Sequence, residues 1–181
     1  MKMPGSAEIK KEIKIPEGVD VILEGRKITV KSKKTTLERT LSHPKIVFEK
    51  KDKAIIIHCK MPTKKEAALA GTFAGHIKNM VEGITNGFTY EMKLVYAHFP
   101  VKTSVKGKEF IIENFLGERT PRKAKILGET KVEITGEKIL LTGSDIEKVS
   151  QTAANIEKAT KIRNRDPRVF QDGIYIVRKG E

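Results

Sequence analysis

The same order of predicted secondary-structure elements occurs twice along the chain, in two segments of about eighty residues each, which is the length of a duplicated domain rather than of a solenoid repeat. In the first segment, residues 19–23 and 27–31 alternate apolar and polar side chains around a glycine turn, as the strands of a tight hairpin do. Residues 101–106 and 109–114 repeat this pattern around a second glycine. The sequence therefore predicts two similar folding units.

A second hairpin follows in each segment, after a stretch without clear periodicity. Short apolar runs separated by polar connectors form its strands, which is typical of adjacent antiparallel strands. The predicted strands are residues 46–48 and 54–57 in the first segment and residues 132–134 and 139–141 in the second. The stretches that precede them, residues 32–44 and 115–128, are interpreted as irregular connections.

Each segment closes with a predicted helix that begins at a capping box, in which a hydroxyl and a carboxylate cap each other's backbone donors. The two boxes are Thr63 with Glu66, and Ser144 with Glu147. Apolar residues then recur at helical spacing, and Gly83 is expected to end the first helix. Gly71 and Gly75 lie inside this helix, where each glycine costs about 1 kcal/mol, so we interpret them as places of close approach.

These elements predict an α+β fold of two tandem duplicated domains, each a small, largely antiparallel sheet with one helix packed on one face. A strand over residues 88–99, with Tyr96 on its apolar side, opens the second domain, and residues 174–177 form a short strand in the tail. The expected boundaries are an N-terminal repeat at residues 1–84, a C-terminal repeat at residues 85–163 and a basic C-terminal extension at residues 164–181.

Positive charge dominates the composition, with 36 Lys and Arg against 23 Asp and Glu and a formal net charge of +13. Such a field attracts polyanions, and neutralised phosphates release condensed counterions, which favours a nucleic-acid partner. The alternative is a heat-adapted interaction module whose charges serve ion-pair networks and solubility, although adaptation does not explain an excess of one sign. Arginine, the better bidentate phosphate ligand, is concentrated in the second half, so contact is expected there.

No group of residues has the spacing of a catalytic, cofactor or metal site. The four histidines are scattered, so we expect neither enzymatic activity nor a cofactor. The lone Cys59 excludes an intramolecular disulfide and is interpreted as a buried structural residue, which favours a reducing cytoplasm. No apolar run is long enough to suggest a membrane span.

Two basic segments are the strongest candidates for RNA contact. Residues 116–125 hold four cations and are interpreted as an ordered loop, whereas residues 161–170 are interpreted as an extended basic strip in which Pro167 prevents a helix. The side of the first helix that carries His76, Lys78, Asn79 and Met80 is a weaker candidate, with a solvated face as the alternative. The predicted RNA-binding residues are Lys106, Lys108, Arg119, Arg122, Lys123, Lys125, Lys161, Arg163, Arg165, Arg168, Tyr175, Arg178, Lys179, His76 and Asn79.

The composition favours folded RNA over a single strand. The chain has no tryptophan and only 6% aromatic residues, so it lacks the stacking platforms of single-strand binders. No helix-turn-helix, zinc-knuckle or basic-zipper spacing is present. A cationic surface interrupted by glycines suits the backbone and shape of folded RNA.

Four long motifs make the chain similar to a known family: residues 79–88 (NMVEGITNGF), 95–100 (VYAHFP), 114–118 (NFLGE) with Pro121-Arg122, and 168–175 (RVFQDGIY). Over nearly its whole length the chain resembles the large-subunit ribosomal protein family called L-six in bacteria and L-nine in eukaryotes. Its ending lacks the Gly-, Lys- and Tyr-rich tail of bacterial members and looks archaeal.

The resemblance implies a structural, non-enzymatic protein of the large ribosomal subunit in the cytoplasm, bound to 23S-type rRNA near the sarcin-ricin region. It also implies that the second domain and tail make most RNA contacts, and that neighbouring large-subunit proteins and, indirectly, translation factors are partners. It implies no membrane and no small-molecule substrate. The alternative function is a free-standing binder of structured RNA outside the ribosome.

Overall fold

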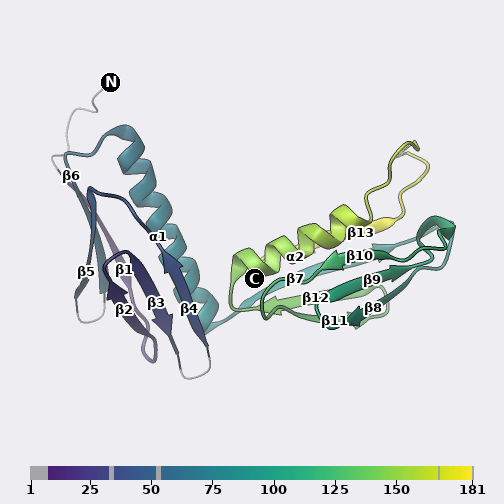
Figure 1. The fold of residues 1–181 in the computed structure, drawn as a ribbon, viewed down its shortest axis with the longest axis horizontal. Coiled ribbons are helices and arrows are strands. Elements are labelled where there is room, and N and C mark those ends of the chain that lie inside the picture. The colour runs from purple at the N-terminus through teal and green to yellow at the C-terminus, as the bar shows by residue number, and fades with distance from the viewer. Residues whose placement is uncertain (1–7, 33–34, 52–53, 167, 181) are drawn as a thin grey trace. The chain divides into compact units, whose positions relative to one another are not determined.

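A computed structural model of the chain describes residues 8–32, 35–51, 54–166 and 168–180. It divides the chain into two compact units, residues 1–86 and residues 87–181, whereas the predicted boundary follows residue 84. Each unit is an α+β structure with one long helix and small antiparallel sheets, as the duplicated pattern predicted (Figure 1). Pro167, whose effect on the basic strip was predicted, lies outside the described residues.

The first unit contains two three-stranded sheets, with strand orders β1-β6-β5 and β2-β3-β4. Helix α1 packs against β1 and β6 of one sheet and against β3 and β4 of the other, which encloses the core. Fully buried branched side chains such as Ile28, Ile55, Ile57 and Ile77 fill that core. The elements are β1 Glu8–Lys14, β2 Asp20–Glu24, β3 Lys27–Lys31, β4 Thr36–Thr40, β5 Ile46–Lys51, β6 Ala54–Lys60 and α1 Lys64–Thr85.

The second unit contains a four-stranded sheet of order β11-β12-β7-β13 and a three-stranded sheet of order β10-β9-β8. Helix α2 packs against β7, β12 and β13 and against β10. A second, separate core holds Phe110, Phe115, Met92 and Ile156. The elements are β7 Phe88–Val95, β8 Lys102–Lys106, β9 Glu109–Glu113, η1 Phe115–Gly117, β10 Arg122–Lys125, β11 Lys131–Thr135, β12 Lys138–Gly143, α2 Ile146–Ala159 and β13 Gly173–Arg178.

The two units correspond strand for strand, with one exception. Strands β1, β6 and β5 have the neighbours that β7, β12 and β11 have, and β2-β3-β4 matches β8-β9-β10. The exception is β13, which pairs with β7 on the side away from β12. Among the described residues of the first unit, no strand occupies the equivalent place beside β1.

Three strands were not predicted, and two of them lie in the stretches that were expected to be irregular. Strand β4 pairs with β3 inside residues 32–44, of which residues 33–34 lie outside the described chain, and β10 pairs with β9 inside residues 115–128. Strand β1 pairs with β6. All three are edge strands that bury few side chains, so their polar sequences carry little of the apolar alternation that identifies a strand.

The first helix begins as predicted and ends later than predicted. Thr63 Oγ1 accepts from Glu66 N at 3.4 Å and Thr63 N donates to the Glu66 carboxylate at 2.7 Å, which confirms the capping box. The helix continues through Gly83, which is buried, to its C-cap at Asn86. Gly87 then adopts a φ of +74°, a left-handed conformation that glycine adopts without strain and that ends the helix.

The second predicted capping box is wrong. Asp145 is the N-cap of α2, and its carboxylate accepts from Glu147 N at 3.0 Å, so the helix starts one residue later than a Ser144 cap requires. Asp and Ser are equally good N-caps, and sequence spacing alone does not choose between adjacent ones. Tyr96 was also misplaced, because β7 ends at Val95 and Tyr96 is exposed.

Candidate nucleic-acid interface

The side chain of Arg122 is fixed at the centre of a cluster in the second unit. Its Nε and Nη2 donate to the Glu118 carboxylate at 2.8 and 2.6 Å, and its Nη1 donates to Ala159 O at 2.9 Å. The guanidinium also lies 4.4 Å from the ring centroid of buried Phe115. Arg122 thereby satisfies a carbonyl at the C-terminal end of α2, where a cation is favoured by the helix dipole.

The hydrogen bonds from Arg122 hold the pKa of Glu118 below its usual value, so the Glu118 carboxylate stays ionised and occupied. Two residues at positive φ, Leu116 at 53° and Gly117 at 76°, turn the chain so that Phe115 enters the core while Glu118 reaches Arg122. Because Arg122 and Glu118 bond to each other, the pair holds the loop against the end of α2 and leaves any phosphate binding to neighbouring cations.

A cationic groove of about 450 Å³ surrounds this pair. The exposed side chains of Lys158, Lys161, Arg163 and Arg165 contribute four positive charges to its lining, and the only carboxylate among the lining residues is the one that Arg122 neutralises. The full lining is Leu116, Glu118, Arg122, Lys158, Ala159, Lys161, Arg163 and Arg165. Such a groove has the charge and the donors to bind phosphate groups.

Hydrogen bonds and ring contacts connect the basic segment to the end of β7. Buried Asp172 accepts from the backbone N–H groups of Ala97 and His98 and, at 2.7 Å, from Nδ1 of the His98 ring. The His98 ring stacks on Phe170 with centroids 4.6 Å apart, and the Arg165 guanidinium lies 4.6 Å from the Phe170 centroid. One chain of contacts thus runs from a buried carboxylate to a cation of the groove.

Asp172 is ionised in this arrangement. Burial by itself raises the pKa of Asp172, but the hydrogen bonds from Ala97 N and from the ring and backbone of His98 outweigh it, so the net pKa lies below the usual value. Because an ionised carboxylate only accepts hydrogen bonds, the proton of the shared bond resides on Nδ1 of His98.

The structure brings some of the predicted RNA-binding residues together and leaves others apart. Arg122, Lys161, Arg163 and Arg165 line the cationic groove, whereas Lys106 and Lys108 lie at the hairpin between β8 and β9. Lys123 forms an ion pair with Glu109 at 3.0 Å, and Tyr175 donates to Gln171 O at 3.2 Å. The remaining predicted residues of the second unit, Arg119, Lys125, Arg168, Arg178 and Lys179, are exposed.

The candidates on the first helix differ in their environment. His76 and Asn79 are half-buried on α1, and Lys78 forms an ion pair with Glu82 at 3.5 Å. Met80, which was predicted to share their surface, is instead buried in the core of the first unit. Its position three residues after Ile77 places it on the apolar face of the helix.

Lys158, His98 and Asp172 were not among the predicted site residues. Lys158 lies in the last turn of α2, and a cation there is a detectable signal, because it complements the helix C-terminus. His98 and Asp172 are far apart in the sequence, so no local pattern predicts their contact. Residues 122–125 were predicted as part of a loop, but they form strand β10, which fixes the direction of Arg122.

The structure also bears on the lone cysteine, on metal ligands and on membrane-spanning helices. Cys59 is buried, as predicted, and burial raises the pKa of its thiol. Within the part of the chain that the structure describes, no three His, Cys, Asp or Glu side chains gather as a metal site would require. In the same described residues, no helix is both long and apolar enough to cross a membrane.

The duplicated α+β fold and the cationic groove define a class of small basic proteins whose charged surface suits an anionic ligand. The family model described as Ribosomal protein L6 matches residues 15–87 and 99–173, one stretch in each unit. The chain belongs to the ribosomal protein L6 family. It is therefore a ribosomal protein and not an enzyme, and the resemblance given by its motifs is confirmed.

Archaeal relatives cover almost the entire chain. The large ribosomal subunit protein uL6 of Methanosarcina mazei is 50% identical over 172 residues, which cover 95% of this chain and 98% of the relative. The protein of the same name from Methanobrevibacter smithii is 45% identical, covering 96% and 98%. That from Archaeoglobus fulgidus is 49% identical, covering 96% and 92%. The archaeal type of the chain is thereby confirmed.

Proposed function

We propose that the chain is a structural constituent of the large ribosomal subunit, in the cytoplasm, that binds 23S-type rRNA near the sarcin-ricin region. Lys and Arg contacts to phosphates stabilise the folded RNA. Membership of the ribosomal protein L6 family and the names of the archaeal relatives support the assignment to the large subunit. The position near the sarcin-ricin region follows from the resemblance alone.

The cationic groove is the observation that carries the proposed RNA contact. Four exposed cations converge there on a rigid cluster formed by Arg122, Glu118 and the end of α2. The planar guanidinium groups of Arg163 and Arg165 lose little conformational entropy for each hydrogen bond they form, and each phosphate that the cations neutralise releases counterions into solution. The groove therefore fits the backbone of a folded RNA without requiring contacts to particular bases.

The same proposal names the partners. Neighbouring large-subunit proteins contact the chain within the particle, and translation factors depend on it indirectly through the RNA that it supports. No small-molecule substrate, cofactor or membrane is part of the proposed function.

Replacing Arg163, Arg165 and Arg168 together by alanine tests the RNA contact. We expect weaker binding to an archaeal large-subunit rRNA transcript and a log–log salt slope that is shallower by about one unit for each lost phosphate contact. Replacing the exposed lysines Lys31, Lys51 and Lys60 of the first unit by alanine removes the same charge elsewhere and is the control. Wild-type affinity and slope in the arginine variant would refute the proposed interface.

Sedimentation separates the proposal from its alternative. A large-subunit constituent remains with large subunits through a moderate-salt wash, whereas a free-standing binder of structured RNA does not. A heat-adapted interaction module would instead bind its partner with an affinity that is indifferent to salt.

A further inference from the structure

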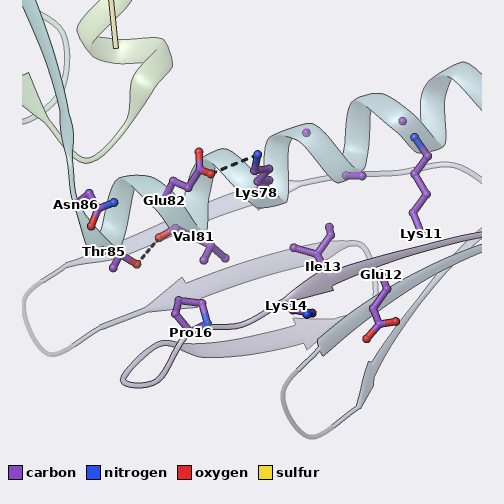
Figure 2. Close-up of a pocket in the computed structure, with 13 residues that line it drawn as sticks. Lys11, Glu12, Ile13, Lys14, Pro16, Lys78, Val81, Glu82, Thr85 and Asn86 are labelled. Atoms are coloured by element: carbon purple, nitrogen blue, oxygen red, sulfur yellow. Dashed lines mark hydrogen bonds and ion pairs between the residues drawn. The ribbon is translucent and has the colours of Figure 1, made fainter. Parts of the chain in front are cut away.

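A groove of about 770 Å³ runs between strand β1 and helix α1 of the first unit (Figure 2). Four consecutive residues of β1, Lys11 to Lys14, line it together with Pro16 and one flank of α1. Consecutive side chains of a strand point to opposite faces, so a hollow that touches all four lies along the edge of the strand. That edge is the side of β1 away from β6, where no strand is paired among the described residues.

The second unit fills the equivalent place with a strand. There β7 stands where β1 stands in the first unit, and β13 pairs antiparallel with its outer edge while packing against α2. The duplication thus offers two copies of one arrangement, one with the outer strand and one in which the described residues supply no such strand. The groove beside β1 is the position that β13 occupies beside β7.

The register of the two sheets aligns individual residues. Ile13 and Glu12 of β1 are opposite Ile55 and Ile56 of β6, and Met92 and Glu91 of β7 are opposite Ile139 and Leu140 of β12. Ile55 and Ile139 are both fully buried and are each the second residue of their strand, so Ile13 corresponds to Met92 and Glu12 corresponds to Glu91.

The partners of Met92 and Glu91 in β13 show what the empty position would take. Ile176 lies opposite Met92. After a shift of register between Ile176 and Arg178, Arg178 lies opposite Glu91 with its guanidinium 3.9 Å from the carboxylate. Ile174 is fully buried on the same strand. A strand beside β1 therefore needs an apolar residue opposite Ile13 and a cation opposite Glu12.

The helix side of the groove leaves room for such a strand. A methyl group added at Gly75 would meet no atom within 4 Å, and one added at Gly71 would meet only the Lys11 ammonium, at 3.1 Å. Lys11 is a flexible side chain at one end of the groove and moves aside at little cost. Gly71 and Gly75 were predicted to allow close approach of another segment, and apart from Lys11 no described atom of the first unit occupies that space.

We propose that an extended segment of a neighbouring protein pairs antiparallel with β1 and fills this groove, as β13 does beside β7. Main-chain hydrogen bonds supply affinity, and an apolar residue with a cation two positions later, across a bulge like that of β13, supplies specificity. That the segment comes from another large-subunit protein rests on the proposed function, whereas the capacity of the groove for a strand does not.

A synthetic peptide with the sequence of residues 172–179, which contains β13, tests the groove on the full-length chain. We expect amide shifts on titration by NMR in β1 and on the groove flank of α1, and slower exchange of the alternate β1 amides that point away from β6. The second unit should stay unchanged, because its own β13 already occupies the equivalent edge. The same peptide with serine at the positions of Ile174 and Ile176 should bind at least about tenfold more weakly.

Two helix variants form a matched pair for this titration. Gly71→Phe fills the groove and should abolish the β1 response, whereas Thr72→Phe, on the adjacent residue outside the groove, should preserve it. Both positions lie on the accessible surface of α1, so both variants are expected to fold. An absent β1 response in the wild type, or one that persists in Gly71→Phe, would overturn the inference.

The partner is tested in purified large subunits. We expect the outward amides of β1 to exchange more slowly there than in the free protein, and a photo-crosslinking residue at position 78 to capture a protein segment. Unprotected β1 amides, or crosslinks to rRNA alone, would overturn the assigned partner. Protection in the free protein that rises with its own concentration would assign the groove to a second copy instead.

A chain absent from large subunits would refute the proposed function, and the peptide titration would still decide whether the groove takes a strand.

Discussion

Arginines of similar sequence context have different roles in this chain. Arg122 is engaged on three sides by Glu118, Ala159 O and the Phe115 ring, whereas Arg163 is exposed at the groove. The sequence predicted a phosphate contact for both, because it shows the charge and not the partner. The same holds for His98, whose contact with Asp172 joins residues 74 positions apart.

Replacing Asp172 by asparagine tests whether this contact positions Arg165 for the proposed RNA binding. The amide cannot accept from all three donors, so His98 and Phe170 should lose their fixed positions and Arg165 its support. We expect RNA affinity to fall roughly three- to fivefold at about 0.15 M salt, which is the size of one phosphate contact. Charge alone predicts the opposite sign, because the variant is more positive.

A control variant and a double-mutant cycle distinguish an effect on Arg165 from an effect on charge or on the fold. Glu133→Gln removes one exposed carboxylate from the same unit and should leave the affinity equal or slightly higher. In a double-mutant cycle, Asp172→Asn should add little to Arg165→Ala if Asp172 acts through Arg165. Additive losses would show that Asp172 stabilises the fold without positioning the groove.

At the scale of elements, the start of a helix depends on interactions between neighbouring residues, whereas an edge strand depends on pairing with a strand elsewhere in the chain. The capping box of α1 was predicted because its two partners are three residues apart and the interaction needs nothing else. Strands β4 and β10 were missed because their pairing partners, rather than their own apolar pattern, make them strands. An edge strand needs only one buried face, and in β10 a single residue, Ala124, is buried.

The capping box predicts a pH dependence of the first unit. Hydrogen bonds from Thr63 N and from Lys45 lower the pKa of Glu66 from 4.5 to about 2. A depressed pKa contributes stability that is complete above about 4.5 and is lost as the pH falls toward 2. We therefore expect Glu66→Gln to lower the melting temperature at neutral pH and to flatten its decline in this acid range.

Thermal unfolding followed from pH 7 to pH 2 measures this difference. Glu82→Gln, on the same helix and exposed, controls for the loss of one carboxylate. An acid dependence in Glu66→Gln as steep as in the wild type would contradict the assigned role of the cap.

At the scale of the whole molecule, each unit has its own hydrophobic core. Core residues of the first unit end at Ile84, and those of the second begin at Tyr90. The helices hold matched residues: Ile77 on α1 and Ile156 on α2 are both fully buried. The chain therefore has two hydrophobic cores, one in each unit, and each core stabilises its own unit.

Alanine substitutions at these two residues should act on different units. Each removes a buried branched side chain and should cost about 2–5 kcal/mol of unfolding free energy in its own unit. Hydrogen exchange read by mass spectrometry should show faster exchange in residues 87–180 for Ile156→Ala and in residues 8–86 for Ile77→Ala. Uniform acceleration across both units in either variant would contradict two separate cores.

The sequence by itself determined the duplication, the helices, the central hairpins, the excess of positive charge and the family, because these depend on periodicity, spacing and composition. Tertiary structure alone decided that Arg122 is engaged inside a cluster, that Lys158 joins the groove, and that β13 covers one sheet edge while no described strand pairs with the matching edge of β1. The physical reason is the distance along the sequence over which each interaction acts. Capping and amphipathic periodicity act between residues a few positions apart, whereas ion pairs, ring contacts and edge-strand pairing join residues that only the folded chain brings together.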